Sequence, residues 1–159
     1  MIHQRSRKPL LCMSPSFCET AVGNLSGPTE IHAVLRAAAA RAKKFYGTPS
    51  SLQYCVLLIL TDGIVNDLHA TQELIRSYQT LQLPLSVVVV GIGRADFTEF
   101  CRWGDAPPNV RGRCKFVEFR KHQFDPDALS REVLANVPHE IVDNLLARSI
   151  LPSDKMSHV

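Results

Sequence analysis

The chain contains 159 residues, which is enough for one domain with a buried core. Hydrophobic residues make up 45% of the chain and charged residues 21%, a composition typical of globular proteins and not of disordered ones. The formal net charge of +3 comes without a long run of like charges, so neither nucleic acid nor an anionic membrane is favoured as a partner.

The number and spacing of the cysteines and the length of the apolar runs indicate the cellular compartment of the protein. The five cysteines are odd in number and form no C-x-x-C pair, which argues against a disulfide framework and against a zinc site. The apolar run Val56–Leu60 is far shorter than the ~20 residues that span a bilayer. We therefore expect a cytoplasmic protein.

The first part of the chain has no helical or strand period, so we expect residues 1–24 to form a poorly ordered leader. Residues 25–150 are expected to form the folded domain, and residues 151–159 a flexible tail. Apolar residues at helical spacing predict a first helix over residues ~30–46, which Gly47 and Pro49 end.

Two uninterrupted apolar runs then predict buried strands, Tyr54–Leu60 and Leu85–Val90. Between them a helix is predicted that Asp67 can cap and Pro84 closes, with Leu81 on its apolar face.

The remaining elements are a short helix at about Asp96–Trp103, a third strand at Cys114–Phe119 and a final helix. Asp125 and Pro126 stand in the preferred cap-then-proline order at the start of that helix. Its apolar stripe continues as far as Leu146, which predicts one long helix.

Helices and strands alternate along the chain, which predicts an α/β fold with a parallel sheet, right-handed crossovers and helices on both faces. Ligands of such folds bind at the carboxyl ends of the strands. The places of interest are therefore Asp62-Gly63 and Gly91-Ile92-Gly93.

Each of these places has a functional and a structural interpretation. Asp62 can hold a hard cation or simply form a turn with Gly63. The glycines at 91 and 93 stand where a dinucleotide-binding loop has them, but Asp96 replaces its third glycine, so a turn is the better interpretation. Likewise Thr29, before the first helix, can be a helix cap or a metal ligand.

Several segments taken together resemble the C-terminal part of the copines. The resemblance is collinear from about Leu25 to Pro152. The matching segments are Gly27-Pro28-Thr29, Tyr54–Gly63, Leu83–Ser86, Val89–Gly93, Phe116–Arg120, Leu134–Pro138 and Ile150–Pro152.

Copines are calcium-dependent phospholipid-binding proteins with two lipid-binding modules, followed by a domain similar to the von Willebrand factor type A fold. The resemblance implies a metal-ion-dependent adhesion site, in which an Asp-x-Ser-x-Ser loop, a threonine and an aspartate surround one divalent cation. The threonine corresponds to Thr29 and the aspartate to Asp62. Their oxygens suit Mg²⁺, Mn²⁺ or Ca²⁺, and a partner's carboxylate can complete the coordination.

This sequence departs from the family pattern before Thr29. Cys12-Met13-Ser14-Pro15-Ser16 has both serines at the family's spacing, but Cys12 replaces the aspartate, and too few residues follow for a helix and two strands. We interpret this match as a coincidence. The expectation is a truncated domain with about half the usual strands and no lipid-binding modules, whose metal binding is weak or absent.

A truncated sheet has consequences for association. The strand at Val56–Leu60 would lack its neighbour and present an unpaired apolar edge, through which the chain could self-associate.

The first functional hypothesis is a non-enzymatic protein-interaction module that binds protein partners, not nucleic acid, and reaches a membrane only through family modules absent from this chain. One alternative is a nonfunctional or regulatory truncated isoform that competes with the full-length protein. Another is a metal-assisted enzyme that uses Asp62 in the cleft at the strand ends.

Overall fold

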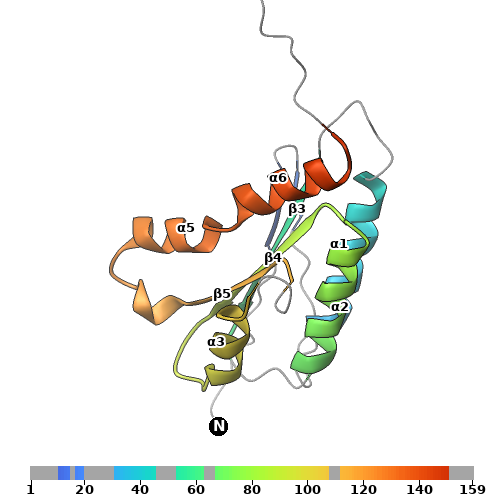
Figure 1. The fold of residues 1–159 in the computed structure, drawn as a ribbon. Coiled ribbons are helices and arrows are strands. Elements are labelled where there is room, and N and C mark those ends of the chain that lie inside the picture. The colour runs from blue at the N-terminus through green and yellow to red at the C-terminus, as the bar shows by residue number, and fades with distance from the viewer. Residues whose placement is uncertain are drawn as a thin grey trace, which may run out of the picture.

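The computed structural model describes residues 11–14, 17–19, 31–45, 53–62, 67–107 and 112–150. Among them, five strands form one sheet in the order β2-β1-β3-β4-β5 (Figure 1). The strands are β1 (Leu11–Ser14), β2 (Phe17–Glu19), β3 (Cys55–Thr61), β4 (Leu85–Gly91) and β5 (Cys114–Glu118). The helices are α1 (Ile31–Phe45), α2 (Leu68–Thr80), α3 (Thr98–Gly104), the short 3-10 helix η1 (Phe119–Lys121), α5 (Pro126–Leu134) and α6 (Val137–Ala147).

The parallel part of the sheet consists of β3, β4 and β5, as the sequence predicted. Every residue of β4 is buried, because helices cover both of its faces. Helices surround this parallel sheet, which confirms the predicted α/β class and is consistent with part of a von Willebrand factor A-like fold.

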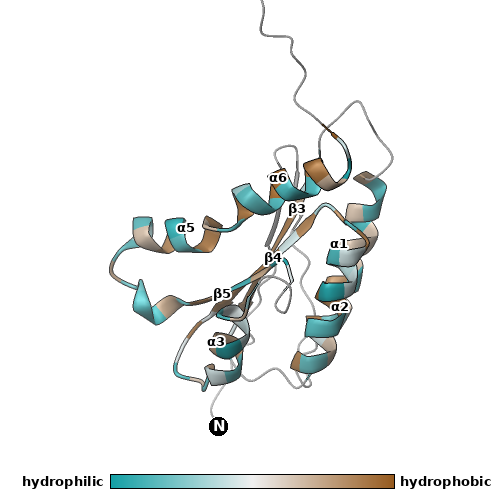
Figure 2. Cartoon of the chain, in the orientation of Figure 1, coloured by the Kyte–Doolittle hydropathy of each residue, from teal (hydrophilic) through white to brown (hydrophobic). Residues whose placement is uncertain are grey.

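Two apolar cores lie on the two faces of the sheet. Figure 2 shows the apolar strands at the centre and largely polar helices outside them. Side chains of α1, α2 and α3 pack on one face, against residues such as Leu57, Val87 and Phe116. On the other face, Val88 and Val90 pack with residues of α5 and α6.

An N-terminal hairpin is the first departure from the predicted structure. The sequence predicted no regular element before residue 25 and an open edge on β3. Instead, β1 pairs antiparallel with β2 and with β3, where Leu11 lies opposite Leu58 and Met13 opposite Val56. The expectation of an unpaired edge along Val56–Leu58 was therefore wrong, because a nearby extended segment satisfies the backbone groups of that edge.

The last helical region is the second departure, since two helices replace the predicted single one. Asp125 caps α5 as predicted, and its Oδ1 accepts a hydrogen bond from Ala128 N at 2.8 Å. The break falls between α5 and α6, just before Pro138. A proline lacks the N–H that would bond to Leu134, and its ring clashes with that carbonyl, so the helix stops and restarts. No helix among the described residues is long and apolar enough to cross a membrane.

Candidate metal-binding edge

The carboxyl ends of the three parallel strands meet at one edge of the sheet. Thr61 lies opposite Gly91, and Gly91 lies opposite Glu118. Neighbouring strands are about 4.8 Å apart, so about 10 Å separates the backbones of Thr61 and Glu118. Asp62 follows Thr61 directly; its side chain is exposed and has no hydrogen bond or ion pair to the residues that the structure describes. The structure therefore places Asp62 directly after β3, at the carboxyl edge of the parallel strands.

The second predicted ligand cannot be placed beside Asp62. The structure describes α1 from Ile31 onward, so Thr29 lies outside the described residues.

Ser14, the first serine of the motif near the N-terminus, lies near the opposite end of β3 from Asp62. Because β1 runs antiparallel to β3 with Met13 opposite Val56, Ser14 lies beside the start of β3. Asp62 follows the other end of this seven-residue strand, and such a strand spans roughly 20 Å. This geometry agrees with the interpretation of the Ser14 spacing as a coincidence.

Asp67 makes a different contact from the predicted one. It precedes α2 at the cap position, but its side chain forms no cap hydrogen bond with that helix. Instead, its Oδ2 accepts a hydrogen bond from the backbone N–H of His32 in the first turn of α1, at 3.0 Å. Its Oδ1 is buried and has no hydrogen-bond partner among the residues that the structure describes. The carboxylate thus links the β3–α2 connection to the start of a second helix.

Glu118 is a buried carboxylate at the same edge that sequence reasoning missed. It accepts hydrogen bonds from Lys121 Nζ at 2.8 Å, Cys101 Sγ at 3.2 Å and Arg120 Nε at 2.9 Å. These bonds, that of Lys121 first, lower the pKa of Glu118 to about 2 although burial opposes the shift. A carboxylate that stays ionised in this way is a poor general acid or base near neutral pH.

A sequence signal for this buried carboxylate exists. Cys114, Phe116 and Glu118 alternate along the strand and are all buried, and two basic residues follow. Side chains two residues apart lie on the same face of a strand, so Glu118 shares the buried face of Cys114 and Phe116. This spacing would have predicted a buried glutamate, with basic residues following it in the sequence.

The thiol of Cys101 takes part in the same cluster. Burial, followed by its hydrogen bond to Glu118, raises the pKa of this thiol. The neutral thiol is a weak nucleophile, so the pair gives no support to nucleophilic catalysis.

The glycine that ends β4, Gly91, and the one that follows it, Gly93, both have structural reasons to be glycine. Gly93 has a φ of 96°, a conformation that side chains rarely adopt. A Cβ on Gly91 would lie 2.9 Å from Cζ of Phe97. Asp96, in place of the third glycine of a dinucleotide-binding loop, accepts a hydrogen bond from Thr98 N at 2.9 Å. These glycines therefore serve the turn and the packing, as the sequence indicated.

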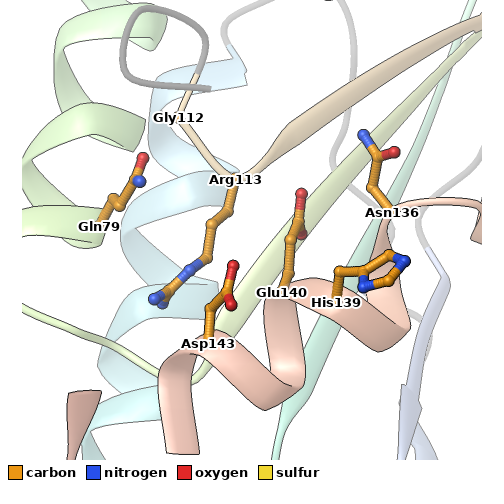
Figure 3. A pocket seen from close by; sticks show the side chains of 7 residues that line it. All are labelled: Gln79, Gly112, Arg113, Asn136, His139, Glu140 and Asp143. Carbon is orange, nitrogen blue, oxygen red and sulfur yellow. The ribbon is translucent and has the colours of Figure 1, made fainter. Parts of the chain in front are cut away.

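A pocket of about 260 Å³ lies elsewhere, near the amino ends of the strands, between α6 and the end of α2. Figure 3 shows the carboxylate of Asp143, on α6, beside the side chain of Arg113, and Glu140 three residues earlier on the same helix. The guanidinium of Arg113 donates to Leu83 O at 2.9 Å and to Gln82 Oε1 at 2.7 Å. These bonds join the residues before β5 to those before β4, so Arg113 has a structural role there.

A buried hydroxyl network continues from this pocket into the sheet. Glu140 accepts a hydrogen bond from Ser86 Oγ, and the hydroxyl of Tyr54 lies 2.8 Å from the same Oγ. Burial raises the pKa of Tyr54 to about 12. The network connects β4 and α6 to Tyr54, the residue before β3, and contains no residue that the sequence had assigned to a site.

Comparison with known proteins identifies the family. The family model described as Copine matches residues 18–153, which include β3 to α6. The chain belongs to the copine family. Its sequence is 32% identical to Copine-E of Dictyostelium discoideum over 143 residues, an alignment that covers 82% of this chain and 24% of that copine. The chain therefore spans about a quarter of the length of this relative.

Proposed function

We propose that the chain is a non-enzymatic copine-like protein-interaction module that binds a protein partner through a divalent cation at the carboxyl edge of the sheet. Asp62 carries the proposal, because its exposed carboxylate lies at this edge without a bond to any described residue. Thr29 is the proposed second ligand, on the strength of its place in the family motif.

The donor set fits a hard cation. One carboxylate and one hydroxyl suit Mg²⁺, Mn²⁺ or Ca²⁺, and positions left to water can be taken by a partner's carboxylate. Ser14, of the motif that resembles the family's first ligand loop, lies beside the start of β3 and not beside Asp62. Binding is therefore expected to be weak, with dissociation constants of about 10⁻⁴–10⁻³ M.

Calorimetric titration with Mg²⁺, Mn²⁺ and Ca²⁺ tests the proposal. The unchanged chain should bind at least one of these ions, and Asp62→Ala and Thr29→Ala should each abolish binding. Asp105→Ala is the control, since it removes another exposed aspartate, at the end of α3. Absence of binding by the unchanged chain, or equal binding by Asp62→Ala, would refute the proposed metal site.

An acidic peptide supplies the second arm of this test. If a partner carboxylate completes the cation's shell, such a peptide should bind with the effective cation present and should dissociate when a chelator is added. A peptide with glutamine and asparagine in place of its acids is the matched control. Equal binding of both peptides would contradict a role for the cation in recognition.

A further inference from the structure

We propose that the pocket between α6 and the end of α2 binds a small zwitterion, a molecule that carries one carboxylate and one ammonium group as a free amino acid does. The pocket lies near the amino ends of the strands, whereas Asp62 follows the carboxyl end of β3. The proposal is therefore independent of the proposed metal site. Every residue that lines the pocket belongs to the part of the chain that the structure describes.

Arg113 provides a buried cation on one wall of the pocket. Only 7% of its surface is exposed, and it forms no ion pair with a described residue. Its guanidinium donates to Leu83 O at 2.9 Å and to Gln82 Oε1 at 2.7 Å, and both acceptors are neutral. An arginine has five N–H donors, so three of them have no partner among the described residues. A buried positive charge that only neutral groups contact favours an anionic group in the adjacent cavity.

Two carboxylates line the same cavity from α6. Asp143 is exposed and forms no hydrogen bond or ion pair with a described residue, and its carboxylate lies beside the side chain of Arg113 (Figure 3). Glu140, three residues earlier, accepts a hydrogen bond from Ser86 Oγ, which holds its side chain at the pocket. These two negative charges favour a cationic group on the α6 side of the cavity.

The combination of charges disfavours a ligand with a single charge. An anion would contact Arg113 but would be repelled by Glu140 and Asp143, and a cation would be repelled by the guanidinium. A zwitterion offsets both repulsions, because its carboxylate can accept from Arg113 while its ammonium group donates to the carboxylates on α6. The side-chain amides of Gln79 and Asn136 also line the pocket, and an amide can donate or accept.

The size of the cavity limits the ligand. Its volume of about 260 Å³ lies below the ~300–1,000 Å³ of pockets that bind drug-sized molecules. Asp143 and His139 are exposed, so the pocket opens to solvent along α6. The cavity therefore suits a molecule of the size of a small amino acid and not a nucleotide.

Calorimetric titration with glycine, β-alanine and γ-aminobutyric acid tests the proposal, since these three zwitterions differ in the distance between their charges. EDTA is present throughout, so that divalent cations do not contribute. At least one of the three should bind with a dissociation constant of about 1 mM or lower. Propionate and propylamine each carry only one of the two charges and should bind at least about 10-fold more weakly than the best zwitterion.

Asp143→Asn is the decisive variant, because this exposed side chain bonds to no described residue and its replacement should leave the fold intact. It should weaken binding of the best zwitterion by about 10-fold. Asp127→Asn is the matched control, since it removes the same charge from an exposed residue of α5 that does not line the pocket. It should change the affinity by less than about 2-fold.

Three results would overturn the proposal. The first is that none of the three zwitterions binds. The second is that propionate or propylamine binds as tightly as the best zwitterion, because one charge would then suffice. The third is equal affinity of Asp143→Asn and the unchanged chain. None of these results bears on the proposed metal site, and Asp62→Ala should bind the zwitterion as the unchanged chain does.

Discussion

Glu118 holds a negative charge inside the carboxyl edge of the sheet, and the cost of burying that charge is offset by its bonds to two cations and a thiol. The side chains of Arg120 and Lys121 are 57% and 63% exposed, so solvent weakens both ion pairs. The cluster nevertheless keeps the pKa of Glu118 well below that of a free glutamate.

This lowered pKa gives a stability prediction with a definite sign. A carboxylate whose pKa is lower in the folded chain stabilises the fold above its unfolded pKa and loses that contribution as the pH falls. For Glu118 the loss should occur between pH 4.5 and about 2. Glu118→Gln should lower the free energy of unfolding at pH 7 by about 1–2 kcal/mol and flatten the acid dependence.

Urea unfolding at pH 7 and at a series of acid pH values measures this effect. Glu99→Gln is the control, because Glu99 forms an exposed pair with Arg102 and should change stability by less than about 0.5 kcal/mol. The same acid dependence in Glu118→Gln and in the unchanged chain would contradict the prediction.

Single residues differ in how far the sequence could predict them. The position of Asp62 at the edge of the sheet was predictable, because it directly follows a strand that the apolar run Tyr54–Leu60 predicts. The partner of Asp67 was not predictable, since the nearest candidate donors belong to its own helix, whereas the actual donor is 35 residues away. Local patterns describe neighbours along the chain and do not report tertiary hydrogen bonds.

Among the elements, β4 is buried throughout and provides a second prediction. Val88 has 1% of its surface exposed and packs beneath α5 and α6, so truncation would leave a cavity. Val88→Ala should lower the free energy of unfolding by about 2 kcal/mol. Val142→Ala makes the same chemical change on α6 at a residue that is 51% exposed, and should cost less than about 0.5 kcal/mol.

Thermal or urea unfolding of the two valine variants separates the effect of burial from the effect of the Val→Ala change itself, which both variants share. Similar losses in both would mean that β4 is not the covered central strand of the parallel sheet.

The accuracy of the element predictions followed the strength of the local pattern. The strands β3, β4 and β5 were predicted within a residue or two, because uninterrupted apolar runs with clear stops leave few alternatives. Leu81, predicted on the buried face of α2, is 57% exposed, since the helix ends at Thr80. The short strands β1 and β2 have no distinctive period; β1 pairs with β3, and β2 pairs with β1.

At the scale of the whole molecule, membrane binding is the property to test. The chain's net charge of +3 includes no polybasic run that would attract an anionic membrane. We therefore expect it to remain in the supernatant when phosphatidylserine-containing vesicles are sedimented, with or without calcium. Vesicles of phosphatidylcholine alone are the control. Sedimentation that requires both calcium and phosphatidylserine would contradict this expectation.

The way in which the hairpin joins the sheet has a consequence for folding kinetics. Met13 pairs with Val56, more than forty residues later in the chain, whereas each parallel pair joins segments connected through a single helical crossover. Closing the longer loop costs more entropy, and contacts that are distant in sequence form more slowly. During synthesis β1 leaves the ribosome well before β3 has been synthesised, so the two strands cannot pair until later. We expect β1 to dock late, so that its contacts slow unfolding more than they accelerate folding.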